Sequence, residues 1–192
     1  MGVFKPLLPV GERPAILRCI SAAKEAGVRD VVVVTGNRHD EIEAVLRKDS
    51  PETTIARNVG FINGMYSSVL TGVEALEKDT DAFFLLPADC CAVTPEILRM
   101  LIGFFQKEGS MTVLHPTYEN RRGHPPLIPY KYKDALLSYD GTDGLRGALG
   151  ALPEMDVDVC SPGVLLDMDT PEDYTAMLRH LNISGETEIL QV

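Results

Sequence analysis

The sequence is short of cysteine, of long apolar segments and of basic charge. Its four cysteines are Cys19, Cys90, Cys91 and Cys160. They include no CxxC pair, so neither a zinc knuckle nor a disulfide framework is indicated, and we expect reduced, mostly buried thiols. No apolar run approaches the roughly 18–20 residues of a membrane helix, and residues 1–10 lack the basic flank and cleavage site of a signal peptide. We expect a soluble, cytoplasmic protein.

The deficit of basic residues limits the partners. The 192 residues include 18 Lys and Arg against 28 Asp and Glu, a formal net charge of −10. A negative surface repels phosphate backbones and anionic lipids at long range, so we expect neither a nucleic acid nor a membrane as a partner. The length suits a single domain. We assign residues 1–181 to it and 182–192 to a C-terminal tail, because no strong apolar period continues there.

Several catalytic motifs are also missing. The sequence contains no GxSxG, HExxH, GxxxxGK[ST] or GxGxxG pattern, which argues against a serine hydrolase, a zinc protease, a P-loop NTPase and a dinucleotide dehydrogenase. The four histidines have no ligand spacing for zinc. These are His39, His115, His124 and His180.

What the sequence does contain is an alternation of strands and helices. Apolar runs predict buried strands at 31–34, 82–86 and 164–166, and further strands are expected at 111–114 and, as short ones, at 54–56 and 126–128. Three- and four-residue apolar spacing and capping residues predict helices at 14–26, 40–47, 65–76, 95–107 and 145–152, and a final helix after the T-x-x-D capping box of Thr170 and Asp173. This order is typical of an open, mostly parallel α/β sheet with helices on both faces.

Aspartates follow two of these apolar runs. Asp89 lies just after one, and Asp167 and Asp169 close another, on one face and roughly 7 Å apart if that strand stays extended. Ligands of such sheets bind beyond the carboxyl ends of the strands. Carboxylates that meet there need a cation, and Mg²⁺ binds one or two of them together with phosphate oxygens. Taken singly, each aspartate could instead begin a turn or flank a helix; together they favour a metal site.

The segment Asn63–Ser68 lies between a short strand and a helix. Backbone N–H groups and two hydroxyls at a helix N-terminus suit an anion or the polar edge of a base. The alternative is a glycine turn followed by a serine cap. The residues proposed to contact a nucleotide here are Asn63, Gly64, Met65, Ser67 and Ser68.

Two cationic positions stand out in an otherwise acidic chain. Residues 121–125 form a compact turn of two arginines, a glycine, a histidine and a proline, which could hold phosphate or could be a solvated loop. Arg146 could face an anionic acceptor or could simply pair with Asp143 one helical turn earlier. Lys5 receives no role from its spacing alone.

Six stretches together resemble one family. They are MGVFKPLLPVGERPAI, NGMYSSVLTG, LPADC, RRGHPPLI, DGTDGLRGAL and LLDMDTPEDY. In this order they are similar to the molybdenum cofactor nucleotidyltransferases, the MobA-like group. The resemblance implies a three-layer Rossmann-like nucleotidyltransferase fold and Mg²⁺-dependent transfer of a nucleotidyl group, CMP from CTP, to the phosphate of molybdopterin with release of pyrophosphate. It also implies a nucleoside triphosphate, a molybdopterin-like acceptor and a molybdoenzyme or its chaperone as partners.

The resemblance implies roles for individual residues as well. Asp89 and Asp167 would hold the metal, with Asp169 beside them, and Lys5 would contact the nucleotide phosphates and act with Asp89 in catalysis. The segment Asn63–Ser68 would line the base site. The acceptor would face Arg122, Gly123, His124 and Arg146.

One part of the family pattern is not present. Members usually open with a buried strand and a glycine-rich loop of the form LAAGxSxRMGxxK, whereas this sequence starts at the MG of that pattern. We therefore expect the first strand of the fold to be missing from the sheet. Two other functions stay open: transfer to a different phosphorylated acceptor such as a sugar phosphate, and a catalytically impaired homologue that binds a nucleotide or cofactor. Either a pyrimidine or a purine could be bound.

Overall fold

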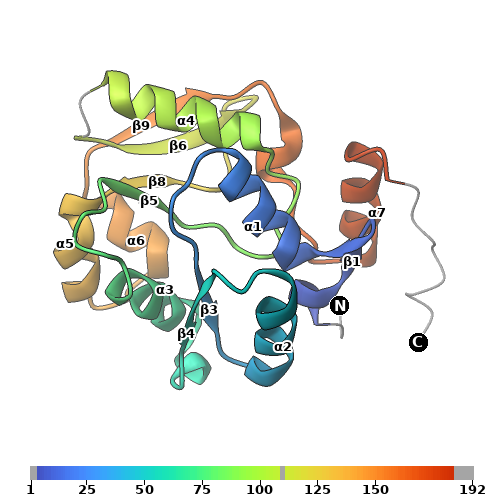
Figure 1. Cartoon of the computed structure of the whole chain (residues 1–192). Helices are drawn as coiled ribbons and strands as arrows, with labels where there is room; N and C mark the ends of the chain where they lie inside the picture. The colour runs from blue at the N-terminus through green and yellow to red at the C-terminus, as the bar shows by residue number, and fades with distance from the viewer. Residues whose placement is uncertain (1–3, 109–110, 184–192) are drawn as a thin grey trace.

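The computed structural model describes residues 4–108 and 111–183 and has the predicted α/β fold (Figure 1). Its helices are α1 (Ala15–Glu25), α2 (His39–Asp49), α3 (Met65–Glu74), α4 (Pro95–Lys107), α5 (Lys133–Ser138), α6 (Gly144–Gly150) and α7 (Pro171–His180). Short 3₁₀ helices are η1 (Lys5–Leu7), η2 (Phe61–Asn63), η3 (Tyr130–Tyr132) and η4 (Pro162–Leu165). The strands are β1 (Pro9–Val10), β2 (Arg13–Pro14), β3 (Val32–Thr35), β4 (Thr54–Arg57), β5 (Ala82–Phe84), β6 (Val113–Tyr118), β7 (Arg121–Arg122), β8 (Leu127–Pro129) and β9 (Glu154–Asp158).

The central sheet is mixed, so the expectation of a mostly parallel sheet is corrected. Strand β8 lies between β5 and β6 and is antiparallel to both, while β9 runs parallel to β6 on its other edge. The reason is a tight hairpin after β6. Glu119 and Asn120 both have positive φ, 50° and 59°, the backbone of a two-residue hairpin turn. The chain therefore reverses into β7 and continues in that direction as β8.

Helices cover both faces of this sheet. Val113 and Ile128 face α3, α5 and α6, whereas the next residue of β6 and the preceding residue of β8, Leu114 and Leu127, face α1 and α4. All four side chains are at most 3% exposed. Successive strand residues point to opposite faces, so the alternation of contacts establishes three layers. Figure 1 shows α3, α5 and α6 gathered on the side opposite α4.

Strands β3 and β4 form a separate parallel pair. Helices α1 and α3 continue over this pair: Ile16 and Ile20 of α1 pack with Val33, and Val34 lies against Gly72 of α3. In the part of the chain that the structure describes, β3 pairs only with β4 and β5 only with β8. The sheet layer is thus divided between β3 and β5.

The predicted strand at 164–166 is wrong, because the segment begins within η4. Pro162 and Gly163 favour a turn, and the Ser161 hydroxyl accepts a hydrogen bond from Gly163 N at 3.3 Å. A Cβ on Gly163 would lie 2.7 Å from the Ala92 carbonyl oxygen, so the turn is held closely against the loop after β5. Val164 is buried as predicted, while Leu165 and Leu166 are only partly buried.

Strand β9 was missed in the sequence analysis. Its residues alternate acidic and apolar side chains, with Met155 and Val157 directed into the core. This alternation is typical of a strand with one solvent-exposed face, and it could have been used to predict β9. The position of β9 matters below, because its acidic side chains engage a predicted site residue.

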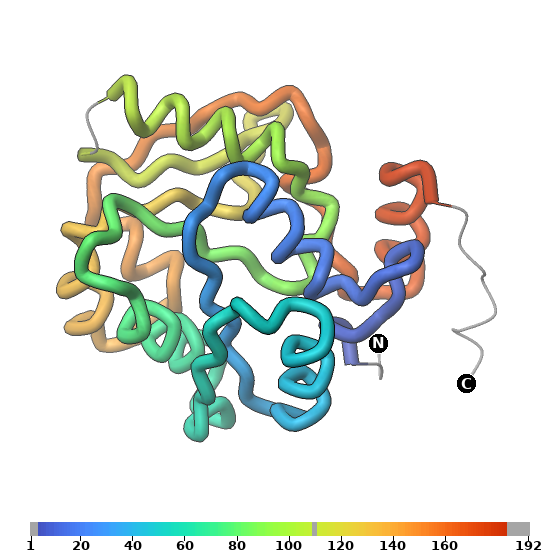
Figure 2. The backbone as a smooth tube through the Cα atoms, viewed as in Figure 1, coloured from blue at the N-terminus to red at the C-terminus, as the bar shows by residue number. Residues whose placement is uncertain are grey.

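Segments from the two ends of the chain lie side by side. Leu8 and Val10 pack against Tyr174 and Met177 of α7, and the Tyr174 hydroxyl donates to the Pro9 carbonyl. Figure 2 shows α7 beside this N-terminal segment. The predicted capping box at the start of α7 is confirmed in both directions. Most of the proposed tail lies outside the described residues.

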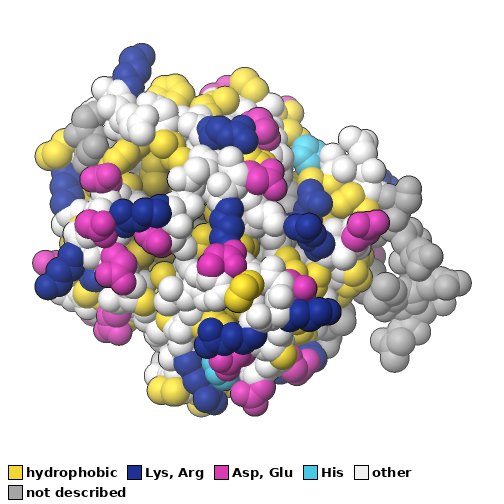
Figure 3. Space-filling model, viewed as in Figure 1, with side chains coloured by type: hydrophobic (Ala, Val, Ile, Leu, Met, Phe, Trp, Pro, Cys, Tyr) yellow, Lys and Arg dark blue, Asp and Glu magenta, His cyan; other side chains and the backbone are white. Residues whose placement is uncertain are grey.

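The surface charges and the free thiols agree with what the composition predicts. On the face in Figure 3, basic side chains lie next to acidic ones; Arg29, for example, pairs with Asp30 and Asp79. None of the described helices is long and apolar enough to cross a membrane. All four cysteines are free thiols, and three are buried as expected.

Candidate active site

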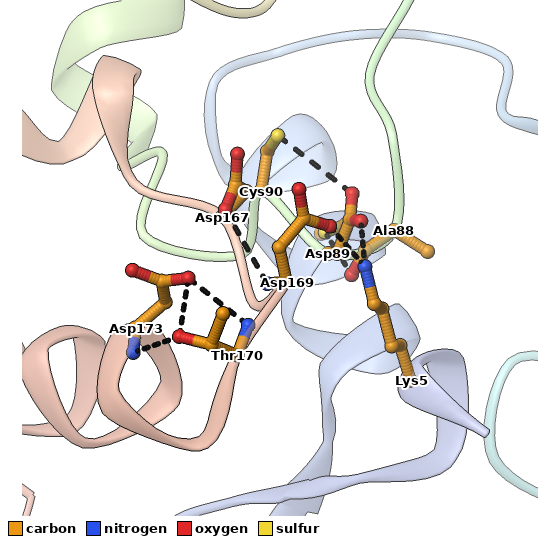
Figure 4. Close-up of polar contacts among 9 residues, drawn as sticks. Lys5, Ala88, Asp89, Cys90, Asp167, Asp169, Thr170 and Asp173 are labelled. Atoms are coloured by element: carbon orange, nitrogen blue, oxygen red, sulfur yellow. Dashed lines mark hydrogen bonds and ion pairs between the residues drawn. The ribbon is translucent and has the colours of Figure 1, made fainter. Parts of the chain in front are cut away.

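Three aspartates and a lysine meet at the end of β5 and before α7 (Figure 4). Asp89 follows β5, and its Oδ2 lies 3.2 Å from Lys5 Nζ. The same ammonium group donates to Asp169 Oδ1. Burial lowers the pKa of Lys5, but the hydrogen bonds to Asp169 and Asp89 outweigh it, so the pKa is raised. The hydrogen bond from Lys5 in turn lowers the pKa of Asp169. We call Lys5, Asp89, Asp167 and Asp169 the carboxylate cluster.

Asp167 joins the cluster through a turn. The prediction that Asp167 and Asp169 share one face of an extended strand is wrong, because no strand forms there. Instead Asp169 N donates to Asp167 Oδ1 at 3.4 Å. Burial raises the pKa of Asp167, and the neighbouring charges of Asp169 and Asp89 raise it further. The three carboxylates are thus close enough to repel one another, and a cation offsets this repulsion.

Thiols pack behind Asp89 and hold its loop. Cys19 Sγ lies 3.8 Å from the Ala88 carbonyl oxygen, and Cys90 Sγ lies 3.9 Å from Asp89 Oδ1. Burial raises the pKa of Cys91 to about 11 and raises that of its two neighbouring thiols as well. These cysteines are therefore protonated at neutral pH and act in packing.

The turn at Gly123 and His124 lies against η4. Gly123 passes so close that a Cβ would lie 2.1 Å from the Val164 carbonyl oxygen, and His124 N donates to that oxygen at 2.8 Å. Burial lowers the pKa of His124, while Asp89 and Asp167 raise it by a smaller amount. Among the described residues, His124 Nδ1 is the one buried side-chain nitrogen or oxygen without a hydrogen-bond partner. The imidazole of His124 is thus buried near Asp89 and Asp167, with one polar atom that has no partner in the protein.

Arg122, proposed for the acceptor, already has partners. Its Nη1 lies 2.8 Å from Glu154 Oε2 and its Nε 2.6 Å from Asp156 Oδ1, both on β9. His115 Nε2 shares Glu154 at 2.8 Å. A contact between Arg122 and an acceptor stays a prediction, and the Nη2 donors of the guanidinium group are not used by these two ion pairs.

Arg146 lies on the exposed surface of α6. The alternative explanation for it was a pair with Asp143, but the ion pairs found within residues 4–108 and 111–183 do not include that one. The side chain is therefore available to an anion.

The segment Asn63–Ser68 forms the turn into α3. Gly64 is the N-cap with φ +96°, a conformation that favours glycine, and no side chain caps the helix. The alternative of a serine cap is thus wrong, since the Ser67 hydroxyl donates back to the Gly64 carbonyl at 2.7 Å. Sequence analysis missed Asn58, a buried side chain that bonds to both serines. Its signal was an amide directly after a short strand.

The donor set of the cluster fits a magnesium nucleotide. Carboxylate oxygens are the hard ligands that Mg²⁺ prefers, and they already surround a positive charge, the ammonium group of Lys5. Within the described residues, no three His, Cys, Asp or Glu side chains form a group able to hold a metal ion by themselves.

Comparison with known proteins defines the class. The α/β fold and the family match place this chain among the nucleotidyltransferases of Rossmann-like fold. Residues 1–156 match the model of the MobA-like NTP transferase domain, and the chain belongs to that family.

Three similar proteins illustrate the range of the class. The molybdenum cofactor cytidylyltransferase of Escherichia coli K12 is 28% identical over 184 residues, which cover 95% of this chain and 92% of that protein. The bifunctional protein GlmU of Jannaschia sp. CCS1 is also 28% identical, over 98% of this chain but only 40% of its own length. The structure of Rv0371c from Mycobacterium tuberculosis H37Rv, solved in complex with manganese, has a TM-score of 0.72 at 22% identity and covers 93% of both chains.

Proposed function

We propose that this protein transfers CMP from CTP to the phosphate of a molybdopterin-like acceptor and releases pyrophosphate, with Mg²⁺ bound at the carboxylate cluster. The observation that carries the proposal is the meeting of Asp89 and Asp169 at the Lys5 ammonium group, with Asp167 beside Asp169. Similarity over nearly the full length of the Escherichia coli cytidylyltransferase supports the choice of base and acceptor.

The chemistry explains why these charges are needed. A phosphate oxygen of the acceptor attacks the α-phosphorus of the nucleotide, so two anions must approach each other. Mg²⁺ on the aspartates neutralises part of this charge when bound. Lys5 exchanges its carboxylate partners for phosphate oxygens, which places a second positive charge beside the leaving pyrophosphate. Catalysis then depends on position and electrostatics, with little covalent help from the protein.

The remaining candidates divide between the two substrates. The turn of Asn63, Gly64, Met65, Ser67 and Ser68 contacts the nucleotide base. The acceptor binds near His124, and Gly123 keeps that turn close against η4. Arg146 and Arg122 supply further positive charge to the acceptor. A molybdoenzyme or its chaperone receives the product.

The test combines binding with turnover. CTP with Mg²⁺ raises the melting temperature of the protein, and Asp89→Ala abolishes the rise because the metal loses its carboxylate. Asp79→Ala is the matched control, since Asp79 is a surface aspartate paired with Arg29. Pyrophosphate release requires both CTP and the acceptor. An absence of any CTP-dependent shift in the wild-type protein would argue against this site.

A second function is favoured by the similarity to the mannose-1-phosphate guanyltransferase of Candida albicans, which is 29% identical over 55% of this chain. In that case the acceptor is a sugar phosphate, and pyrophosphate appears with a sugar 1-phosphate but not with molybdopterin. A homologue that only binds its ligands shows the CTP-dependent melting shift without pyrophosphate release from either acceptor.

A further inference from the structure

Asn58 is the centre of a neutral hydrogen-bond network below the turn into α3. Its side chain is 5% exposed, and its backbone N donates to the Thr35 carbonyl at 2.7 Å, which keeps it at the end of the β3–β4 pair. Nδ2 donates to Ser67 Oγ at 2.8 Å and to Ser68 Oγ at 2.9 Å. Oδ1 accepts from Gly60 N at 2.9 Å. One amide therefore joins a strand, a loop and a helix start.

The two serines differ in what their own protons can do. The Ser67 hydroxyl donates to the carbonyls of Gly60 and Gly64, at 3.2 and 2.7 Å, so its proton is used inside the loop. The Ser68 hydroxyl only accepts a hydrogen bond within the described residues. An amide N–H occupies a lone pair of that oxygen, so the hydroxyl proton must point away from Asn58. Ser68 is half-buried and can reach a ligand with this proton.

We propose that Asn58 is a positioning residue for the nucleotide: by donating to Ser68 Oγ, it directs the Ser68 proton toward the bound base. This inference rests on the proposed function, because it assumes that the turn into α3 contacts the nucleotide. An aspartate at position 58 has nearly the same shape as asparagine, but its carboxylate can only accept hydrogen bonds. It would turn the protons of both serines inward and withdraw the Ser68 donor from the ligand.

The experiment is a double-mutant cycle on CTP binding. The dissociation constant of CTP with Mg²⁺ is measured by calorimetry for the wild-type protein, Asn58→Asp, Ser68→Ala and the double variant. Each single variant raises the dissociation constant about fivefold, the usual effect of one neutral hydrogen bond. The double variant raises it no further, because the same donor is lost in each case. In turnover, KM rises by the same factor and kcat changes less than about twofold.

A matched control lies one helical turn further on. Thr71→Val removes a hydroxyl that donates to the Ser67 carbonyl at 3.0 Å without facing the ligand, so it leaves the dissociation constant within about twofold. Asn58→Ala replaces Asn58→Asp if the buried carboxylate prevents folding. It also frees the Ser68 proton to turn, so its effect and that of Ser68→Ala are again non-additive.

The outcomes separate this inference from the function on which it rests. If the wild-type protein binds CTP but Ser68→Ala or the Asn58 variants leave the dissociation constant unchanged, the positioning role is wrong and the proposed function stands. Additive effects in the double variant also overturn it, because they show two independent contributions. If the wild-type protein does not bind CTP, the proposed function fails and this inference fails with it.

Discussion

The carboxylate cluster and the loop from Asn58 to Ser68 are organised in opposite ways. The cluster joins charged side chains from remote segments: Lys5 lies 84 positions from Asp89 and 164 from Asp169. The loop joins neutral groups no more than ten positions apart. The charged region therefore depends on how distant segments of the chain pack together, whereas the hydrogen bonds of the neutral region form within one short segment.

The exposure of the charged groups supports this difference. The side chains of Lys5 and Asp169 are 26% and 66% exposed, and ion pairs so open to water contribute little to stability. Lys5 can thus leave its partners at small cost when another cation arrives. The Asn58 amide is buried, so the loss of any one of its hydrogen bonds would leave an unsatisfied polar group. The carboxylate cluster can therefore rearrange, whereas the loop is preformed.

The largest effect is expected from Lys5→Met. It removes the positive charge shared by Asp89 and Asp169, so the carboxylates repel one another and the nucleotide loses a phosphate contact. We expect kcat/KM to fall about 100-fold, the scale seen when one charge-stabilising donor is removed. In the absence of nucleotide, Mg²⁺ should raise the melting temperature of Lys5→Met more than that of the wild-type protein. An equal rise in both would show that Lys5 and the metal do not share the carboxylates.

A smaller effect is expected from Gly36→Ala, which strains the preformed loop. A Cβ at this position would lie 2.6 Å from Phe61 Cβ, so the loop must move or Phe61 must leave. Overpacking of this kind costs about 1–3 kcal/mol of unfolding free energy. Chemical denaturation measures the loss, and Gly103→Ala, where a Cβ meets nothing within 4 Å, is the control. A variant as stable as the wild type would mean that the loop is not held against β3.

The smallest effect is expected from a change of pH at β9. Burial raises the pKa of Glu154, but hydrogen bonds from Arg122 and His115 outweigh it and lower the pKa below its ordinary value. The stability from this carboxylate is therefore complete above about pH 5 and is lost as the pH falls through the lowered pKa. We expect Glu154→Gln to cost about 1 kcal/mol at pH 7, a difference that closes toward pH 3.

A comparison with the neutral loop sharpens this result. Asn58→Ala removes no charge, so its cost in unfolding free energy should stay constant as the pH falls from 7 to 3, while that of Glu154→Gln shrinks. Thermal or chemical unfolding over this pH series measures both. Parallel curves for the two variants would show that the Glu154 ion pairs contribute nothing to stability.

Much of the fold could be predicted from local patterns. The predicted helices at 95–107 and 65–76 appear as α4 and α3, because apolar period and helix-start residues act within a few turns of chain. The capping box of Thr170 and Asp173 is likewise a local device. Short elements were harder to predict from the sequence. The buried run at 164–166 was read as a strand although Pro162 and Gly163 favour a turn, and β9 was missed because acidic residues interrupt its apolar positions.

By itself, the sequence determined which residues carry charge, where the chain turns and which faces must be buried, since these depend on side-chain chemistry and short-range backbone preferences. Only the tertiary structure decided that Lys5 lies between two aspartates, that Arg122 is engaged with β9 and that Asn58 donates to two serines. Such contacts depend on how sheets and helices pack over long separations in the chain. A spacing pattern in the sequence carries no information about them.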